Sequence, residues 1–251
     1  MTDITSETVL GAFLVFCRIG GCLLIVPGFS SMRIPVQIRL FLAVAVSLSL
    51  TPVLLPFVTP VSKPADPARL FAAIGSEAAI GFTIGLLARL MFMALQTMAV
   101  AVAQAVGLGG MIAGVADNGE QQPAVATLFT MTATMMIFAA DQHWELLRGL
   151  KDSYSVLSPA GGFSARLALV DVTDQLTDAF LLTLRITSPF LIYSVIVNLA
   201  VGITNKLTPQ IPIYFIAMPF VTAGGLLLLY FSIAEVLTIF SAAFGTWLQQ
   251  G

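Results

Sequence analysis

Residues 40–62 carry no charged side chain, and this feature restricts the chain to folds that a lipid bilayer can accommodate. An α-helix needs about 20 predominantly apolar residues to cross the hydrocarbon core. Across the chain 58% of residues are hydrophobic and 10% are charged, whereas a soluble domain has about 45–50% and about 25%. The sequence therefore predicts an all-α, polytopic membrane protein, which we expect to form one domain over residues 1–251.

Six apolar stretches approach or exceed the length of a membrane span. They are Val9–Val26, Leu40–Ser62, Leu70–Val106, Pro123–Ala140, Ala179–Asn205 and Leu207–Trp247. Three prolines, Pro52, Pro56 and Pro60, predict that the second helix ends or kinks in its second half. The third stretch is too long for one simple span. The turn at residues 205–212 predicts that the last two stretches form a helical hairpin.

Two connecting segments have compositions of their own. Residues 106–123 hold too many glycines for a stable helix. Residues 141–178 are predicted to contain a short amphipathic helix, a turn at residues 158–162 and the entry to the fifth stretch. The amphipathic face is formed by Trp144, Leu147, Leu150 and Tyr154.

The glycine-rich segment permits two interpretations. Non-helical backbone at membrane depth persists only where it is buried in protein or lines a cavity, so the segment is either a pore plug or an ordinary solvent-exposed connection. If it is a plug, apolar side chains exclude water from the passage and acidic ones stay hydrated at its mouth. The candidate gate residues are Gly107, Leu108, Gly109, Gly110, Met111, Ile112, Gly114 and Asp117.

Five ionisable residues lie inside the apolar stretches: Arg18, Glu77, Arg89, Arg185 and Glu235. Each costs about 2.5–3.5 kcal/mol in hydrocarbon, so each should face protein or water. They either pair with one another or with partner subunits to fix packing, or they carry ions or protons. Glu77 and Arg89 are about 18 Å apart along a continuous helix, so each needs a partner from another helix.

Glu77, Gly81 and Gly85 recur every four residues and share one helix face. Small residues with this spacing allow a neighbouring backbone to approach closely. The neighbour can belong to the same chain or to another subunit.

Catalytic and metal-binding signatures are absent from the sequence. There is no HExxH, GxSxG or P-loop motif, and the single histidine, His143, stands beside Trp144 at a predicted helix edge. Cys17 and Cys22 point in different directions on one helix, which argues against a disulfide or a metal site. We expect no enzyme activity, no cofactor, no metal and, with a net charge of −2, no nucleic-acid partner.

Basic residues do not orient the chain in the membrane. When successive connections are assigned to alternate sides of the membrane, one side has Arg33, Arg39 and Lys206. The other side has Lys63, Arg69, Arg148, Lys151 and Arg166. Arg148, Lys151 and Arg166 lie in a long connection, and charges in long connections have little influence on membrane orientation. This near balance leaves the positive-inside rule without a clear result.

The ordered motifs resemble those of a known family, the FliR/SctT subunits of type III secretion export gates. An N-terminal signature is carried by Arg18, Pro27, Pro35, Arg39 and Pro52. The similarity continues through Glu77-Gly81-Gly85, the glycine-rich segment Gln104–Gly110 with Asp117, the pairs His143-Trp144 and Ser158-Pro159, and a C-terminal signature around Pro209-Gln210. Pro212 departs from the family pattern, which has a polar residue there.

This resemblance implies a multi-pass inner-membrane subunit of the flagellar basal body. It implies assembly with FliP- and FliQ-type subunits, next to FlhB- and FlhA-type subunits, and a plug role for the glycine-rich loop as unfolded export substrates pass. Residues expected in helix or subunit packing are Arg18, Glu77, Gly81, Gly85, Arg89, Arg185, Pro209 and Gln210. Alternatives are an injectisome subunit and a secondary transporter that uses Glu77 or Glu235, although the two halves show no inverted repeat.

Overall fold

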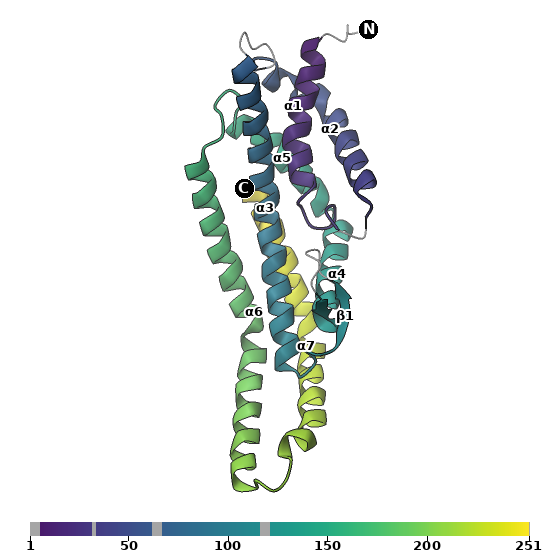
Figure 1. The fold of residues 1–251 in the computed structure, drawn as a ribbon, viewed down its shortest axis with the longest axis vertical. Helices are drawn as coiled ribbons and strands as arrows, with labels where there is room; N and C mark the ends of the chain where they lie inside the picture. Colours follow the sequence, from purple (N-terminus) through teal and green to yellow (C-terminus); the bar gives the residue numbers. More distant parts are fainter. Residues whose placement is uncertain (1–5, 32–33, 62–66, 116–120, 251) are drawn as a thin grey trace. The chain divides into compact units, whose positions relative to one another are not determined.

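The structure, a computed structural model, describes residues 6–31, 34–61, 67–115 and 121–250 (Figure 1). In these ranges the chain forms seven helices and one small antiparallel sheet. The helices are α1 (Ser6–Leu23), α2 (Val36–Val58), α3 (Pro67–Ala105), α4 (Ala124–Ala139), α5 (Gln142–Val156), α6 (Ala165–Leu207) and α7 (Ile213–Gln250). The strands are β1 (Ile112–Val115) and β2 (Gln121–Pro123).

Five of the helices, α1, α2, α3, α6 and α7, are long and apolar enough to cross a membrane. A sixth candidate span is the pair α4 and α5, which together pass the same test but are bent by 71°. The prediction of an all-α membrane protein with about six apolar helical segments, some of them broken, is confirmed.

Proline and glycine set the helix ends much as the sequence predicts. Helix α2 continues through Pro52 and Pro56 and ends at Val58, before Pro60, so its predicted end in the second half of the stretch is confirmed.

Helix α3 is continuous over 39 residues. At 1.5 Å per residue it is about 58 Å long, which is more than the roughly 30 Å hydrocarbon core.

The chain divides into two compact units. The first comprises Met1–Met91, Ala140–Leu176 and Gly245–Gly251, and the second comprises Phe92–Ala139 and Thr177–Phe244. The expectation of one domain stays a prediction.

The core of the first unit is formed by apolar side chains of α1, α2 and α5. Leu14, Val15 and Ile19 of α1 pack with Leu54 of α2 and Tyr154 of α5, and all are buried. These α1 positions recur at helical spacing, so one face of α1 faces protein. The predicted amphipathic helix after residue 141 is present as α5, and it directs Tyr154 into this core.

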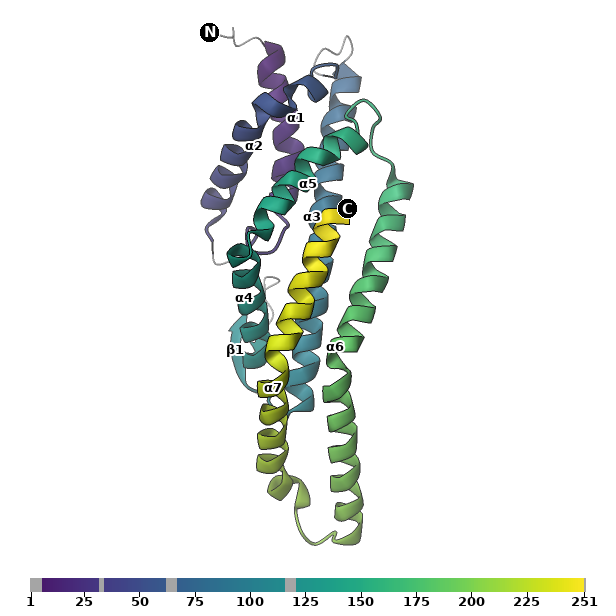
Figure 2. The ribbon, with the colours of Figure 1, turned by 180° about the vertical axis from the view of Figure 1, so that it is seen from behind.

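The second unit contains the C-terminal helical hairpin. Helices α6 and α7 run antiparallel and are joined by the turn at residues 208–212 (Figures 1 and 2). Within this unit the Tyr193 hydroxyl donates to the Val221 carbonyl at 2.6 Å, and the Phe92 ring meets the Phe240 and Phe244 rings edge-on at 5.4 and 5.8 Å. The predicted hairpin is confirmed.

Candidate functional site: a glycine-rich loop and a buried ion-pair cluster

The glycine-rich segment begins where Gly107 ends helix α3. Gly107 has φ of +78°, its N–H donates to Gln104 O at 3.1 Å, and the Leu108 N–H donates to Ala103 O at 2.8 Å. This pair of bonds is a Schellman motif, in which a residue with left-handed backbone caps the last carbonyls of a helix. Glycine adopts that conformation without steric cost, so Gly107 turns the chain out of the helix at this point.

The base of the loop is packed against α7. Val106 is fully buried, and a Cβ added to Gly225 of α7 would overlap Val106. A Cβ added to Gly107 would lie 3.2 Å from Thr222 Oγ1. Close packing at Val106, Gly107 and Gly225 therefore fixes the start of the loop within the second unit.

Beyond this base the loop forms a turn and then the small sheet. Met111 N donates to Leu108 O at 3.1 Å, and Ala124 N donates to Met111 O at 2.7 Å, which links the loop to the start of α4. Strand β1 pairs antiparallel with β2, with an irregularity between Ile112 and Gly114. The sequence predicts a non-helical segment here but not strands. Asp117 lies outside the described residues.

Burial falls along the loop from its base to the first strand. Leu108 and Gly109 are half-buried and Gly110 is exposed. The Met111 and Ile112 side chains are 59% and 58% exposed. The loop therefore combines a fixed base with a stretch whose backbone is hydrogen-bonded but whose apolar side chains are mostly exposed.

The second feature is an ion pair in the core of the first unit. Arg18 of α1 donates from Nε to Glu77 Oε2 at 2.7 Å and from NH2 to Glu77 Oε1 at 2.8 Å. Relative exposure of the two side chains is 0% and 1%. This bidentate geometry is the strong form of an Arg–carboxylate contact. Glu77 thus has its partner on another helix, as its position in an apolar stretch requires.

Helix α5 and the residue after it complete the shell around Arg18. NH1 donates to Ser153 Oγ at 3.1 Å, NH2 donates to the Leu157 carbonyl at 2.8 Å, and the guanidinium carbon lies 3.9 Å from the centre of the Tyr154 ring. We name Arg18, Glu77, Ser153, Tyr154 and Leu157 the Arg18 cluster. It joins α1, α3 and α5 through one buried cation.

The glycines that follow Glu77 bring α3 against α1. A Cβ at Gly81 would overlap the Arg18 backbone, and one at Gly85 would lie 2.8 Å from Cys22 O. The GxxxG face is thus occupied by a helix of the same chain. The close approach also places Arg18 within reach of Glu77, one turn before Gly81.

The other predicted packing residues do not join this cluster. Arg89 is half-buried, Arg185 is exposed on α6, and Pro209 and Gln210 are exposed in the α6–α7 turn. Glu235, the remaining charge in an apolar stretch, is exposed on α7. No ion pair joins Arg89, Arg185 or Glu235 to any residue in the described ranges. Of the predicted orienting residues, Arg33 and Lys63 lie outside those ranges.

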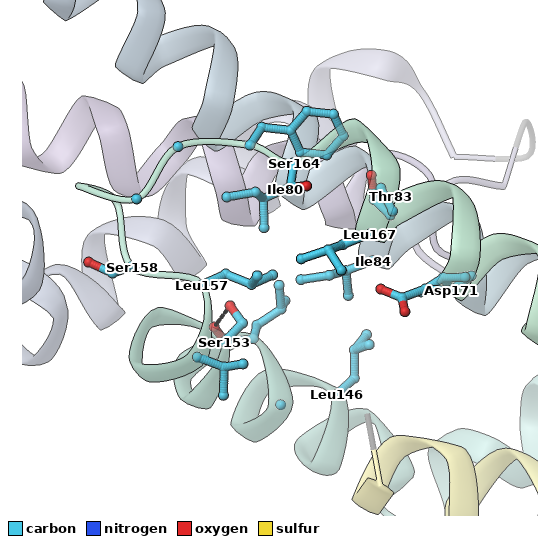
Figure 3. Close-up of a pocket in the computed structure, with 18 of the residues that line it drawn as sticks. Ile80, Thr83, Ile84, Leu146, Ser153, Leu157, Ser158, Ser164, Leu167 and Asp171 are labelled. Carbon is cyan, nitrogen blue, oxygen red and sulfur yellow. Dashed lines mark hydrogen bonds between the residues drawn. The ribbon is translucent and has the colours of Figure 1, made fainter.

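Sequence reasoning missed the roles of Ser153 and Leu157, and it missed a cavity beside them. The cavity holds about 410 Å³ in the first unit, between α3, α5, the turn at residues 158–164 and the start of α6 (Figure 3). Figure 3 shows Ile84 and Leu167 among its lining side chains. The turn signal at residues 158–162 was visible in the sequence, but it did not reveal which helices the turn would face.

Sequence comparisons identify the family to which the chain belongs. The family described as "Bacterial export proteins, family 1" matches residues 9–247. The chain is 27% identical to flagellar biosynthetic protein FliR of Caulobacter vibrioides, over 94% of both chains. It is 28% identical to FliR of Aquifex aeolicus over 93% of this chain and 89% of the relative, and 23% identical to FliR of Escherichia coli over 91% and 88%. The chain therefore belongs to the family of bacterial export proteins, family 1.

Proposed function

We propose that this chain is a subunit of the inner-membrane export gate of a flagellar type III secretion apparatus. The family match over residues 9–247 and the FliR names of its relatives support this function. The apolar helices suit a multi-pass membrane subunit. In this role the chain seals the pore at rest and yields as unfolded export substrates pass, without catalysis of its own.

The glycine-rich loop is the proposed seal, and the contrast between its base and its exposed stretch carries the proposal. Val106 and Gly107 fix the point from which the loop leaves α3, while the Met111 and Ile112 side chains are 59% and 58% exposed among the described residues. A seal of this kind excludes water by apolar contact and opens when few contacts hold it. A loop packed along its whole length would resist opening.

Three charged side chains that form no ion pair within the described ranges support the presence of partner subunits. Arg89, Arg185 and Glu235 lie within long apolar helices. An unpaired charge there is costly, so complementary groups on other subunits are expected to meet them. By family resemblance we propose FliP- and FliQ-type subunits as direct partners, next to FlhB- and FlhA-type subunits.

The alternatives have less support. An injectisome subunit would share this architecture, but the similar proteins are named flagellar. A transporter that couples ions through Glu77 would need that carboxylate to be accessible, whereas both of its oxygens accept hydrogen bonds from buried Arg18.

Deletion of residues 109–113 tests the seal. It removes the exposed turn and leaves Val106 and Gly107 in place, so we expect the complex to assemble and to leak small ions across the inner membrane. Ion conductance is measured in cells, with complex yield followed on native gels. Met135→Ala, which removes a 72% exposed apolar side chain on α4 outside the loop, is the control and should not leak. An assembled complex with unchanged conductance after the 109–113 deletion would exclude the plug role.

A further inference from the structure

The cavity beside the Arg18 cluster has the properties of a binding site. Its volume of about 410 Å³ lies in the range of small-molecule sites, about 300–1,000 Å³. The α3 wall contributes Ile80, Ile84 and Leu87, and the α5 wall contributes Leu146 and Leu150. These apolar walls favour an apolar group, and Thr83, Ser153, Ser158, Ser164 and Asp171 supply the polar part of the lining.

Hydrogen bonds of the Arg18 cluster hold one wall of the cavity in place. Ser153 and Leu157 line the cavity and also accept hydrogen bonds from Arg18. The wall they form is therefore tied to α1 and α3 through a buried ion pair. A preformed wall lowers the ordering cost of taking up a ligand.

Charge is confined to a single lining residue. Asp171, near the start of α6, is the only ionisable side chain among the described residues that line the cavity, and Figure 3 shows it at one end of the group. Its carboxylate favours a cationic group and repels an anionic one. The occupant should thus be apolar over most of its length and carry a cation at one end.

Size distinguishes between one hydrocarbon chain and a larger group. The cavity volume of about 410 Å³ is near the lower end of the roughly 300–1,000 Å³ of small-molecule sites, so it suits one acyl chain rather than a whole two-chain lipid. The medium around the spans of a membrane protein supplies such chains directly.

We propose that this cavity binds one acyl chain of an amine-bearing phospholipid, with the ammonium group of the headgroup at Asp171. The hydroxyl of Ser164, which also lines the cavity, can donate to the lipid phosphate. This site is independent of the glycine-rich loop and of the gating proposed for it.

Lipid retained by the purified complex tests the proposal. The complex is extracted in a mild detergent, and bound phosphatidylethanolamine and phosphatidylglycerol are quantified by mass spectrometry for each copy of this chain. We expect about one phosphatidylethanolamine per copy, which is the occupancy of a single specific site. Ala168→Phe places a ring in the cavity and should lower retention about tenfold, the lower end of the cost of overpacking a filled site. Asp171→Asn should retain lipid but lose the preference for phosphatidylethanolamine.

Leu169→Phe is the matched control, since Leu169 is exposed on the same helix and is not among the lining residues. Its lipid retention should equal that of the parent. Equal retention in Ala168→Phe, or no retained lipid in the parent complex, would overturn the proposal. Leak and complex yield are separate readouts, so a failure of the gate function is distinguished from a failure of this site.

A second measurement applies if Ala168→Phe does not assemble. Trp247 lines the cavity, and its fluorescence in the parent complex is obtained as the difference from a Trp247→Phe complex. Phosphatidylethanolamine brominated on one acyl chain should quench it saturably at low mole fraction, and more strongly than brominated phosphatidylglycerol. Quenching that is linear with mole fraction and equal for both lipids would show bulk lipid contact only and refute the site.

Discussion

Around Arg18 four hydrogen bonds and an aromatic face surround a fully buried cation, whereas Met111 and Ile112 in the glycine-rich loop expose more than half of their surface. Both regions depend on glycine, but in different ways. Gly81 removes a side chain so that two helices meet, and Gly107 supplies a backbone conformation that ends a helix. Glycine in the first region therefore allows two helices to make contact. In the second region it ends helix α3, and the chain continues as a non-helical loop.

The contrast indicates where the chain can change its conformation at a low cost in free energy. Disrupting the Arg18 cluster either exposes a buried charge to solvent or leaves it buried without its partner. The first unit therefore has one strongly preferred arrangement around Arg18. The loop beyond Gly107 has few buried side chains, so alternative conformations differ little in free energy. If the loop gates the passage, opening need not disturb the Arg18 cluster.

The largest effect is expected for Gly81→Leu. A Cβ at this position overlaps the Arg18 backbone, so α1 and α3 must separate and the ion pair must stretch. We expect a loss above about 4 kcal/mol and failure of complex assembly, measured as complex yield on native gels. Gly75→Leu on the same helix is the control, because a Cβ there meets nothing within 4 Å. Normal yield for Gly81→Leu would show that α1 and α3 do not pack in this way.

Glu77→Ala is expected to have the next largest effect. It leaves the Arg18 guanidinium buried without its carboxylate, which costs about 3–5 kcal/mol. The double variant Arg18→Leu with Glu77→Leu removes both charges and should recover part of this loss. Thermal dissociation midpoints of the purified complexes provide the measurement. A double variant less stable than Glu77→Ala would contradict the assignment of the cost to an uncompensated charge.

Patterns local in sequence predicted most of the fold. Apolar stretches predicted the long helices, the glycines of residues 106–123 predicted a non-helical segment, and the spacing from Trp144 to Tyr154 predicted α5. Each of these depends on neighbours in sequence, which is why hydrophobic period and turn chemistry suffice.

Non-local pairings were beyond the same reasoning. Burial cost indicates that Arg18 and Glu77 need partners, but they are 59 residues apart and nothing in their local patterns links them. Ser153 and Leu157 have no distinctive local pattern, and their hydrogen bonds with Arg18 depend on the packing of α5 near α1. Strands β1 and β2 are only four and three residues long, which is too short for an alternating pattern to predict them. Their structure depends on the pairing of the two strands.

Gly107→Ala should have a smaller effect, confined to the loop. Alanine in the left-handed region costs about 1–2 kcal/mol, and the added Cβ also lies 3.2 Å from Thr222 Oγ1. We expect an assembled complex with increased ion leak and a modest fall in the thermal midpoint. Gly110→Ala is the control, because that position is neither left-handed nor near another atom. Identical conductance for the two variants would argue against Gly107 as the anchor of the seal.

The smallest effect is expected where an ion pair of equal length lies at the surface. Arg148 NH1 and Glu145 Oε1 on α5 are 2.7 Å apart, the same N–O distance as Arg18 Nε to Glu77 Oε2, but their side chains are 69% and 34% exposed. Water solvates both groups when the pair breaks, so the pair contributes only about 0.3–0.5 kcal/mol. Arg148→Gln should therefore leave complex yield unchanged and shift the thermal midpoint far less than Glu77→Ala, and added salt should reduce even that shift by screening the exposed charges. Measuring both variants at low and high salt isolates burial as the variable. If Arg148→Gln destabilised the complex as much as Glu77→Ala, the strength of the Arg18 cluster could not be attributed to its removal from solvent, and Arg148 would have to bind a group on another subunit.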